Sequence, residues 1–187
     1  MIRIIDDALT PEEIEGLYRL YTSSEMPYFL SKSSATMVYE HFQPGVQKRY
    51  DEDNSWLEQF EDRPFFLHPI VEDSQVLCAT HNMLQEMVNR IGINNKIFRA
   101  RINLVHPSST GKSSLPHIDY PEPHLVLLYY FNDSDGDTIM YDNEVNETQR
   151  ITPKAGRFVL FDGMTLHSST PPVTNKFRVV FNINLEV

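Results

Sequence analysis

Hydrophobic positions follow helical spacing in two segments of the first half of the chain. After a short strand-like start, IRIIDDAL, apolar residues recur every three or four positions over residues 11–22. Thr10 supplies a capping hydroxyl, Pro11 suits the first helical position, and two glutamates follow at the positive end of the helix dipole. A second helical pattern covers roughly residues 73–91 and ends at Gly92. We therefore predict two amphipathic helices in this half.

The second half of the chain changes to a strand-like pattern. Turn residues rather than helices separate its apolar segments, IFRARINLV, HLVLLYYF, RFVLF and KFRVVFNINLEV. This favours an antiparallel sandwich or barrel, with the helices covering one sheet. We predict a single, mainly β domain over residues 1–187, with a helical part over about 1–95 and a β core over about 96–187. The polar stretch 31–54 is either a long loop, which can serve as a lid, or a pair of weak strands.

Composition narrows the classes of function. The formal net charge of −10 argues against a protein that binds by neutralising nucleic-acid phosphates. Cys78 is the only cysteine, so any metal must be held by nitrogen and oxygen ligands rather than by a cysteine cluster. The start has no signal-peptide pattern, and no stretch is apolar enough to span a membrane. We predict a soluble, cytoplasmic protein; nothing in the sequence sets its oligomeric state.

Three residues form a candidate metal site. His117 and Asp119 are two positions apart, and on an extended backbone such side chains point to the same side. An accidental His-x-Asp is expected about 0.45 times in this composition, so the motif alone is weak. His167 follows the apolar strand RFVLF and a turn, near a strand end. Two imidazoles and one carboxylate leave three open octahedral positions, which suits iron(II) and oxygen chemistry.

Zinc hydrolysis is the competing use of such a ligand set. It requires a general base beside the metal, and the sequence offers no clear one. The nearest candidates, Glu122 and His124, are more typical of exposed turn residues.

The last strand adds an anion-binding candidate. Its residues alternate, so that one face is apolar and the other carries Lys176, Arg178, Asn182 and Asn184. If the apolar face packs under the helices, Arg178 points into the barrel, where an uncompensated guanidinium is costly. The far carboxylate of a dicarboxylic cosubstrate can pair with it while the other end of that molecule chelates the metal. An internal pair with an aspartate or glutamate is the alternative.

These segments together resemble the iron(II)/2-oxoglutarate-dependent oxygenases of the prolyl 4-hydroxylase-like type. The similar segments, from about Arg99 to Leu185, are RINL, HID, LLYYFNDSDGDT, ITPKAGRFVLFDGMTLHSS and the strand of Arg178. The helix TPEEIEGLYRLY is also similar to the opening of that family. The resemblance implies a double-stranded β-helix (jelly roll, cupin-like), with the metal site at the mouth of the barrel.

The resemblance also implies ligands and roles. It assigns iron(II) to His117, Asp119 and His167, and the far carboxylate of 2-oxoglutarate to Arg178, with Lys176 as the alternative because some prolyl 4-hydroxylases use lysine there. Tyr130, rather than its neighbour Tyr129, is expected to assist in cosubstrate binding, and Asn103 is a further cosubstrate-binding candidate. No catalytic residue is predicted beyond the metal site.

The implied activity is that of a dioxygenase. It couples oxidative decarboxylation of 2-oxoglutarate by O₂ to hydroxylation of a substrate C–H, with ascorbate as an accessory. The resemblance favours a prolyl residue in a peptide or protein as the substrate. The alternatives are a small-molecule 2-oxoglutarate hydroxylase, a nucleobase oxygenase, which the acidic composition disfavours, and a catalytically silent jelly-roll binding module, which an intact ligand set disfavours.

Overall fold

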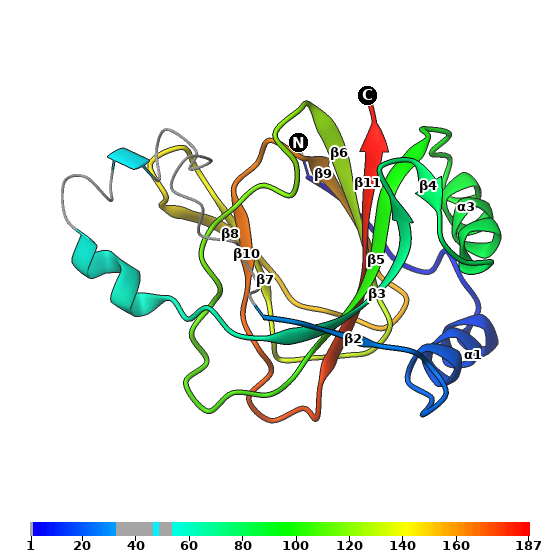
Figure 1. The fold of residues 1–187 in the computed structure, drawn as a ribbon, viewed down its shortest axis with the longest axis horizontal. Coiled ribbons are helices and arrows are strands. Elements are labelled where there is room, and N and C mark those ends of the chain that lie inside the picture. Colours follow the sequence, from blue (N-terminus) through cyan, green and yellow to red (C-terminus); the bar gives the residue numbers. More distant parts are fainter. Residues whose placement is uncertain (1, 33–46, 49–53) are drawn as a thin grey trace.

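The computed structural model describes residues 2–32, 47–48 and 54–187. In this part of the chain, two antiparallel sheets and two α-helices form the fold (Figure 1). The helices are α1 (Pro11–Tyr21) and α3 (Thr80–Arg90), and a 3₁₀ helix, η2, spans Asn54–Gln59. The large sheet contains β1 (Ile2–Ile5), β2 (Phe29–Ser31), β3 (Phe65–Glu72), β4 (Gln75–Val76), β5 (Ile97–Val105), β6 (His124–Tyr130), β9 (Phe158–Asp162) and β11 (Arg178–Glu186). The small sheet contains β7 (Thr138–Tyr141), β8 (Glu147–Ile151) and β10 (His167–Ser169).

The sheets form a double-stranded β-helix, as predicted. The large sheet has the order β1-β9-β6-β11-β5-β3-β2, with β4 paired to β3, and the small sheet has the order β10-β7-β8. Figure 1 shows α1 and α3 on one side of the large sheet and the small sheet on the other side. The last strand, β11, therefore runs through the centre of the large sheet between β5 and β6, where it is hydrogen-bonded on both edges.

Helix α1 begins where the sequence predicts. The Thr10 hydroxyl accepts the amide proton of Glu13, and the Glu13 carboxylate accepts that of Thr10, which satisfies two amide groups that the first turn leaves without helical partners. The second predicted helix begins later than expected. Residues 73 and 74 adopt positive φ angles in the turn between β3 and β4, and α3 begins only at Thr80. No helix of the described residues has the length and apolar character needed to cross a membrane.

The N-terminal part contributes more strands than predicted. Helices α1 and α3 both lie before residue 95, and β2, β3 and β4 belong to the same region and to the large sheet. The segment FFLHPIVE of β3 lacks the two-residue alternation that identifies half-buried strands, and it contains Pro69 next to an irregularity in its pairing. Most of the polar stretch 31–54 lies outside the described residues; Ser31 itself ends β2.

The two faces of β11 divide as the alternation predicts. One face packs in the main core with α1, α3 and the neighbouring strands, through Val179, Phe181, Ile183 and Leu185. The other face points between the two sheets. The neighbouring rings of β6 separate in the same way, because Tyr129 packs in the core under the helices and Tyr130 packs between the sheets. The interior of the barrel is thus lined by one face of each central strand.

Gly136 gives a testable packing constraint near the start of the small sheet. A Cβ atom at this position would lie 2.8 Å from the carbonyl oxygen of Thr170 and 2.8 Å from the nitrogen of Pro172, and backbone atoms cannot easily move away. We expect Gly136→Ala to reduce the free energy of unfolding by about 1–3 kcal/mol. The melting temperature then falls by about 2–4 °C for each kcal/mol, as measured by circular dichroism.

Gly16→Ala is the matched control for this prediction. Gly16 lies in α1 with no atom within 4 Å of an added Cβ, so alanine is expected to stabilise the helix by about 0.5–1 kcal/mol. Equal melting temperatures for Gly136→Ala and the unaltered protein contradict the predicted clash.

Candidate metal centre

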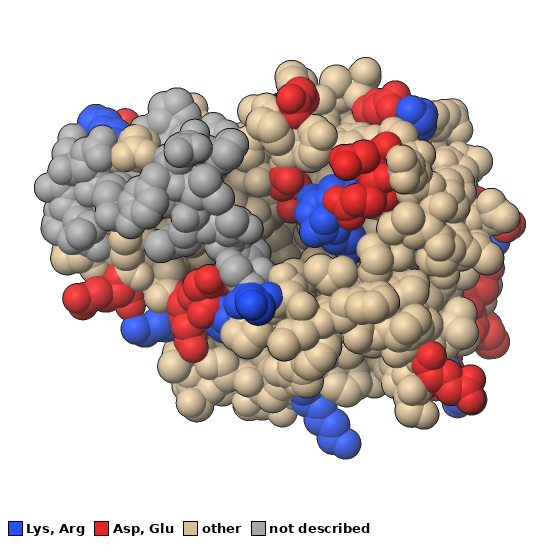
Figure 2. Space-filling model, in the orientation of Figure 1, with Lys and Arg blue, Asp and Glu red and all other residues tan. Residues whose placement is uncertain are grey.

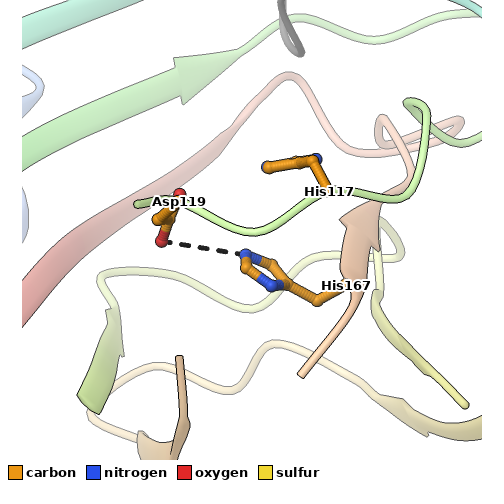
Figure 3. A group of neighbouring side chains, drawn as sticks. All are labelled: His117, Asp119 and His167. Atoms are coloured by element: carbon orange, nitrogen blue, oxygen red, sulfur yellow. Dashed lines mark ion pairs between the residues drawn. The ribbon is translucent and has the colours of Figure 1, made fainter. Parts of the chain in front are cut away.

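The three predicted metal ligands come together at one end of the barrel. His167 is the first residue of β10, whereas His117 and Asp119 lie in the segment between β5 and β6. The ligand atoms of the three side chains all lie within 4.8 Å of one another. In Figure 3 the carboxylate of Asp119 points to the ring of His167, and the two atoms joined by the dashed line, Oδ2 and Nε2, are 3.7 Å apart. Residues about fifty positions apart in the sequence therefore form one cluster.

Backbone pairing positions the two histidines. The amide of His117 donates to the carbonyl of His167 at 2.9 Å, and the reverse bond has the same length, so the two residues form an isolated antiparallel bridge. Their rings lie with centroids 4.9 Å apart. This bridge extends the edge of the small sheet by one residue pair and places both imidazoles on the same side.

Hydrogen bonds fix the orientation of both rings. Nδ1 of His117 lies 2.9 Å from the carbonyl oxygen of Leu115, and Nδ1 of His167 lies 3.0 Å from that of Thr165. Because a carbonyl only accepts, Nδ1 carries the proton in each ring and Nε2 keeps its lone pair for a metal. Burial lowers the pKa of His167 to about 4, so its imidazole is neutral at neutral pH. Both rings are therefore prepared as metal ligands.

The carboxylate of Asp119 is held by amide groups of β11. Nδ2 of Asn182 lies 3.2 and 3.0 Å from its two oxygens, and Nδ2 of Asn184 lies 3.1 Å from Oδ2. Nη1 of Arg99 lies 3.8 Å from Oδ1. Burial alone raises the pKa of Asp119, but the electrostatic effects of His167 and Arg99 and the hydrogen bond from Asn184 outweigh it and lower that pKa below its usual range. Asp119 is thus ionised and held in a defined orientation.

Arg178 is buried in the barrel without an anionic partner. It is 4% exposed, its Nη2 donates to the hydroxyl of Thr138 at 2.8 Å, and its Nε has no hydrogen-bond partner within the described residues. No carboxylate of the described residues lies within ion-pair distance of the guanidinium, so the internal pair considered from the sequence is absent in this part of the chain. Burial lowers the pKa of Arg178, although arginine stays protonated. A buried cation in this condition needs an anion.

The other residues predicted to bind the cosubstrate, Tyr130, Asn103 and Lys176, differ in their position relative to Arg178. Tyr130 is fully buried, its hydroxyl lies 2.8 Å from that of Thr138, and its ring centroid lies 5.4 Å from Cζ of Arg178. Asn103 lines the pocket described below, and its buried Oδ1 has no partner. Lys176 is exposed and precedes β11, so it lies outside this pocket.

A pocket of about 320 Å³ connects these groups. The three candidate ligands, Arg178 and Asn103 line it, together with polar and apolar residues of both sheets, including Thr138, Ser168, Leu128 and Val180. This volume is within the range of small-molecule sites. Figure 2 shows a hollow on this face of the molecule, with basic and acidic side chains beside it. We call this space the site pocket.

The site pocket lacks a second carboxylate among the described residues that line it, since Asp119 is the only one. The two general-base candidates from the sequence, Glu122 and His124, do not line the site pocket. The prediction that both are exposed turn residues is wrong for His124. Glu122 is exposed, as expected, but His124 is 2% exposed rather than a turn residue in solvent, because its ring packs against Phe98. This arrangement gives no support to a metal-assisted hydrolase.

The groups present fit an iron(II) ion and a dicarboxylate. Two imidazoles that direct Nε2 to a metal and an ionised carboxylate, with ligand atoms within 4.8 Å of one another, match a ligand set that occupies one face of a metal. The buried, unpaired Nε of Arg178 fits a carboxylate at the far end of the same pocket. The donor chemistry and the orphaned guanidinium therefore match the cofactor and cosubstrate predicted from the sequence.

Sequence reasoning did not assign functions to four residues of this site. Thr138 binds Arg178, Asn182 and Asn184 bind Asp119, and Arg99 lies beside that carboxylate. The two asparagines stand on the polar face of the alternating last strand, and that alternation is the signal that pointed to them. Thr138 carries no comparable signal, because nothing in the sequence places β7 opposite β11.

Comparison with known proteins agrees with the predicted resemblance. A family model described as the 2OG-Fe(II) oxygenase superfamily matches residues 103–186, a segment that contains the three candidate ligands and Arg178. No curated protein sequence matches the chain.

Solved structures with this fold include enzymes that act on different substrates. An oxidoreductase of the 2OG-Fe(II) oxygenase family from Burkholderia pseudomallei is 11% identical, with a TM-score of 0.67 over 98% of this chain and 84% of that chain. A prolyl hydroxylase from Trichoplax adhaerens, in complex with a peptide fragment of hypoxia inducible factor, is 16% identical, with a TM-score of 0.54 over 97% and 82%. A non-heme alpha-ketoglutarate-dependent epimerase from nogalamycin biosynthesis is 12% identical, with a TM-score of 0.63 over 99% and 76%. At these identities the likeness establishes the fold.

Proposed function

We propose that this protein hydroxylates a substrate C–H, because a model of the 2OG-Fe(II) oxygenase superfamily matches residues 103–186. The proposed iron ligands are His117, Asp119 and His167, and the proposed 2-oxoglutarate anchor is Arg178. The whole chain is proposed to act as one oxygenase domain. The observation that carries the proposal is the buried guanidinium of Arg178, which lines the same pocket as the metal-ligand cluster and has no anionic partner in the part of the chain that the structure describes. A barrel that only binds a metal has no need for such a cation, whose burial is costly.

The side chains have separate tasks in this proposal. The carbonyls of Leu115 and Thr165 keep Nε2 of the two histidines free for the metal, and the amides of Asn182 and Asn184 hold the carboxylate of Asp119. When bound, iron(II) and 2-oxoglutarate supply oxidative decarboxylation by O₂, which yields succinate and carbon dioxide and oxidises the substrate C–H.

The cosubstrate is oriented from the opposite end of the pocket. Arg178 binds its far carboxylate, and the hydroxyl of Thr138 holds Nη2 of that guanidinium in place. Tyr130 donates to or accepts from the same threonine, so it positions the pair, and Asn103 offers a further polar contact from β5. Leu128 and Val180 make part of the wall apolar, which reduces the access of water to the charged contacts.

For the substrate, the proposal keeps a prolyl residue of a peptide or protein, with a small molecule as the alternative. The first is supported by the shared fold with a prolyl hydroxylase, and the second by the shared fold with an epimerase of a biosynthetic pathway. A cytoplasmic location belongs to the same proposal; Cys78 is a free thiol, which suits a reducing compartment.

The direct test is succinate formation by the purified protein. With iron(II), ascorbate and 2-oxoglutarate we expect slow, metal-dependent succinate release, and we expect faster release with a proline-containing peptide that gains one oxygen atom by mass spectrometry. A chelator is expected to stop both. Absence of 2-oxoglutarate-dependent succinate under all these conditions contradicts the oxygenase and favours a binding module.

A further inference from the structure

We propose that the prime substrate carries a carboxylate close to the carbon that reacts, and that Arg99 binds this carboxylate beside the metal centre. The proposal rests on the proposed function and specifies its substrate class. It is based on a second group of basic side chains in the site pocket, separate from Arg178.

Two neighbouring arginines of β5 line the site pocket. Arg99 and Arg101 are two positions apart on this strand, so they share a face, and both are among the residues that line the pocket. Their side chains are 16% and 27% exposed, so both are largely withdrawn from water. Figure 2 shows basic and acidic side chains together at a hollow of this face. A largely buried pair of like charges next to a binding pocket calls for compensation.

The acidic partners within the described residues do not balance this pair. Arg101 donates two charge-assisted hydrogen bonds to the carboxylate of Glu72, at 3.0 and 2.7 Å. Nε of Arg99 lies 3.7 Å from the same carboxylate. The second carboxylate near Arg99 is Asp119, at 3.8 Å. Asp73 forms no ion pair with either guanidinium among the described residues.

Metal binding removes one of these two partners. Asp119 is proposed as an iron ligand, so bound iron(II) neutralises its negative charge, and Asp119 no longer compensates Arg99. Glu72 then faces two guanidinium groups alone, and one positive charge is left over at the pocket wall. The cosubstrate does not balance it, because its far carboxylate is assigned to Arg178 on β11. An additional anion is therefore expected when the site is complete.

The guanidinium of Arg99 keeps hydrogen-bond donors that suit a carboxylate. Nη1 donates to the side-chain oxygen of Asn184 at 3.1 Å and lies 3.4 Å from the backbone oxygen of Asp119, while Nη2 has no acceptor among the described residues. Asn184 also holds Asp119, so one amide keeps the arginine and the metal ligand together. A carboxylate bound at Nη2 consequently lies near the metal.

This position limits the chemistry of the substrate. Nη1 of Arg99 lies 3.8 Å from Oδ1 of the proposed iron ligand Asp119, so a carboxylate bound to this guanidinium lies only a few bonds from a carbon that reacts at the metal. A free amino acid derivative or a residue at the C-terminus of a peptide meets this requirement. An internal prolyl residue flanked by uncharged residues does not.

The test compares acids with their carboxamides. N-acetyl amino acids are one series and short peptides ending in proline are the other, each offered as the free acid and as the amide, and the ratio of kcat/KM for acid and amide is measured from succinate release and oxygen gain. We expect the acid to be preferred by at least about 20-fold, the effect of a well-formed charged contact in a pocket. The two series separate a small acid from a peptide terminus as the source of the carboxylate.

Variants assign the preference to Arg99. Arg99→Gln is expected to bring the ratio close to one, whereas Glu72→Gln is expected to raise it because a competing anion is removed. Arg19→Gln, on the exposed side of α1, is the matched control and keeps the ratio. If Arg99 only braces Asp119, acid and amide lose activity equally and the ratio is retained in Arg99→Gln.

The outcomes separate this inference from the proposed function. The carboxylate site is overturned by any of three results: no acceleration by any acid, equal rates for acids and amides, or an unchanged ratio in Arg99→Gln. Basal succinate release in the same experiments still supports the oxygenase. Absence of basal succinate release, together with no stabilisation by 2-oxoglutarate, overturns both.

Discussion

His167→Ala is expected to abolish metal-dependent succinate formation, with a fall of at least about a hundredfold. The variant removes one of three proposed ligands, and the loss of even an outer hydrogen-bond partner of a metal ligand costs about 10–100-fold in affinity or activity. Metal binding itself is expected to weaken in parallel, measured by titration of the variant with iron(II) under anaerobic conditions or with manganese(II).

His167 is also a packing residue, so folding must be controlled in this experiment. Its side chain is buried and its ring contacts Phe161, which means that alanine leaves a cavity. His117→Ala is the second variant, because His117 is less buried and is expected to give the same loss. His81→Ala, on α3 and outside the site pocket, is the matched control. Equal succinate yields for the unaltered protein and His167→Ala, with metal content controlled, contradict the assignment.

Arg178→Met is expected to raise the 2-oxoglutarate concentration needed for half-maximal rate by about 30- to 4000-fold. This range follows from about 2–5 kcal/mol for removing one partner of a buried, hydrogen-bonded charge pair. Iron binding is expected to persist, because Arg178 contacts none of the three proposed ligands among the interactions of the described residues. The measurement is the dependence of succinate release on 2-oxoglutarate.

Thermal unfolding tests the same assignment without turnover. In the absence of 2-oxoglutarate the charge of Arg178 is uncompensated, so replacing it with an apolar residue of similar length is expected to leave the melting temperature unchanged or raise it. With 2-oxoglutarate at about 100 times its dissociation constant, the unaltered protein gains about 2.7 kcal/mol, which Arg178→Met loses. Lys176→Met is the control, since Lys176 is exposed outside the pocket. Loss of the 2-oxoglutarate effect in Lys176→Met, but not in Arg178→Met, transfers the anchor to Lys176.

The candidate site could be predicted in outline because its main residues stand in periodic or short-range patterns. The alternation of β11 separates the core face from the face of Arg178, and a central strand with one buried apolar face permits only one register. His117 and Asp119 are two residues apart, so local geometry brings them together. For these features, neighbours along the chain carry the information.

Other parts of the site depend on pairing between distant segments. The bridge between His117 and His167, and the contact between Arg178 and Thr138, each join the large sheet or its loops to the small sheet. The short strands β7 and β10 were not predicted, since three or four residues give too little alternation to identify a strand. Strand β3 is longer, but its polar and apolar residues do not alternate, so the two-residue pattern of a strand is missing there as well.

Arg99 illustrates the difference most clearly. In the sequence it is one of several charged residues at a strand, and its partners Glu72, Asp119 and Asn184 come from three other segments. Only the folded arrangement reveals that one shared acid faces two arginines beside the metal centre. An electrostatic imbalance is a property of three-dimensional neighbours, and no local pattern reports it.

By itself, the sequence determined the mainly β class, the start of α1, the inward face of β11 and the set of candidate ligands, because helical and strand periods and capping chemistry act between residues close in the chain. Only the tertiary structure decided how the small sheet meets the large one, which hydroxyl and amide groups hold Arg178 and Asp119, and that Arg178 has no anionic partner among the described residues. These depend on contacts across the barrel, whose partners are chosen by packing of the whole fold rather than by local preference.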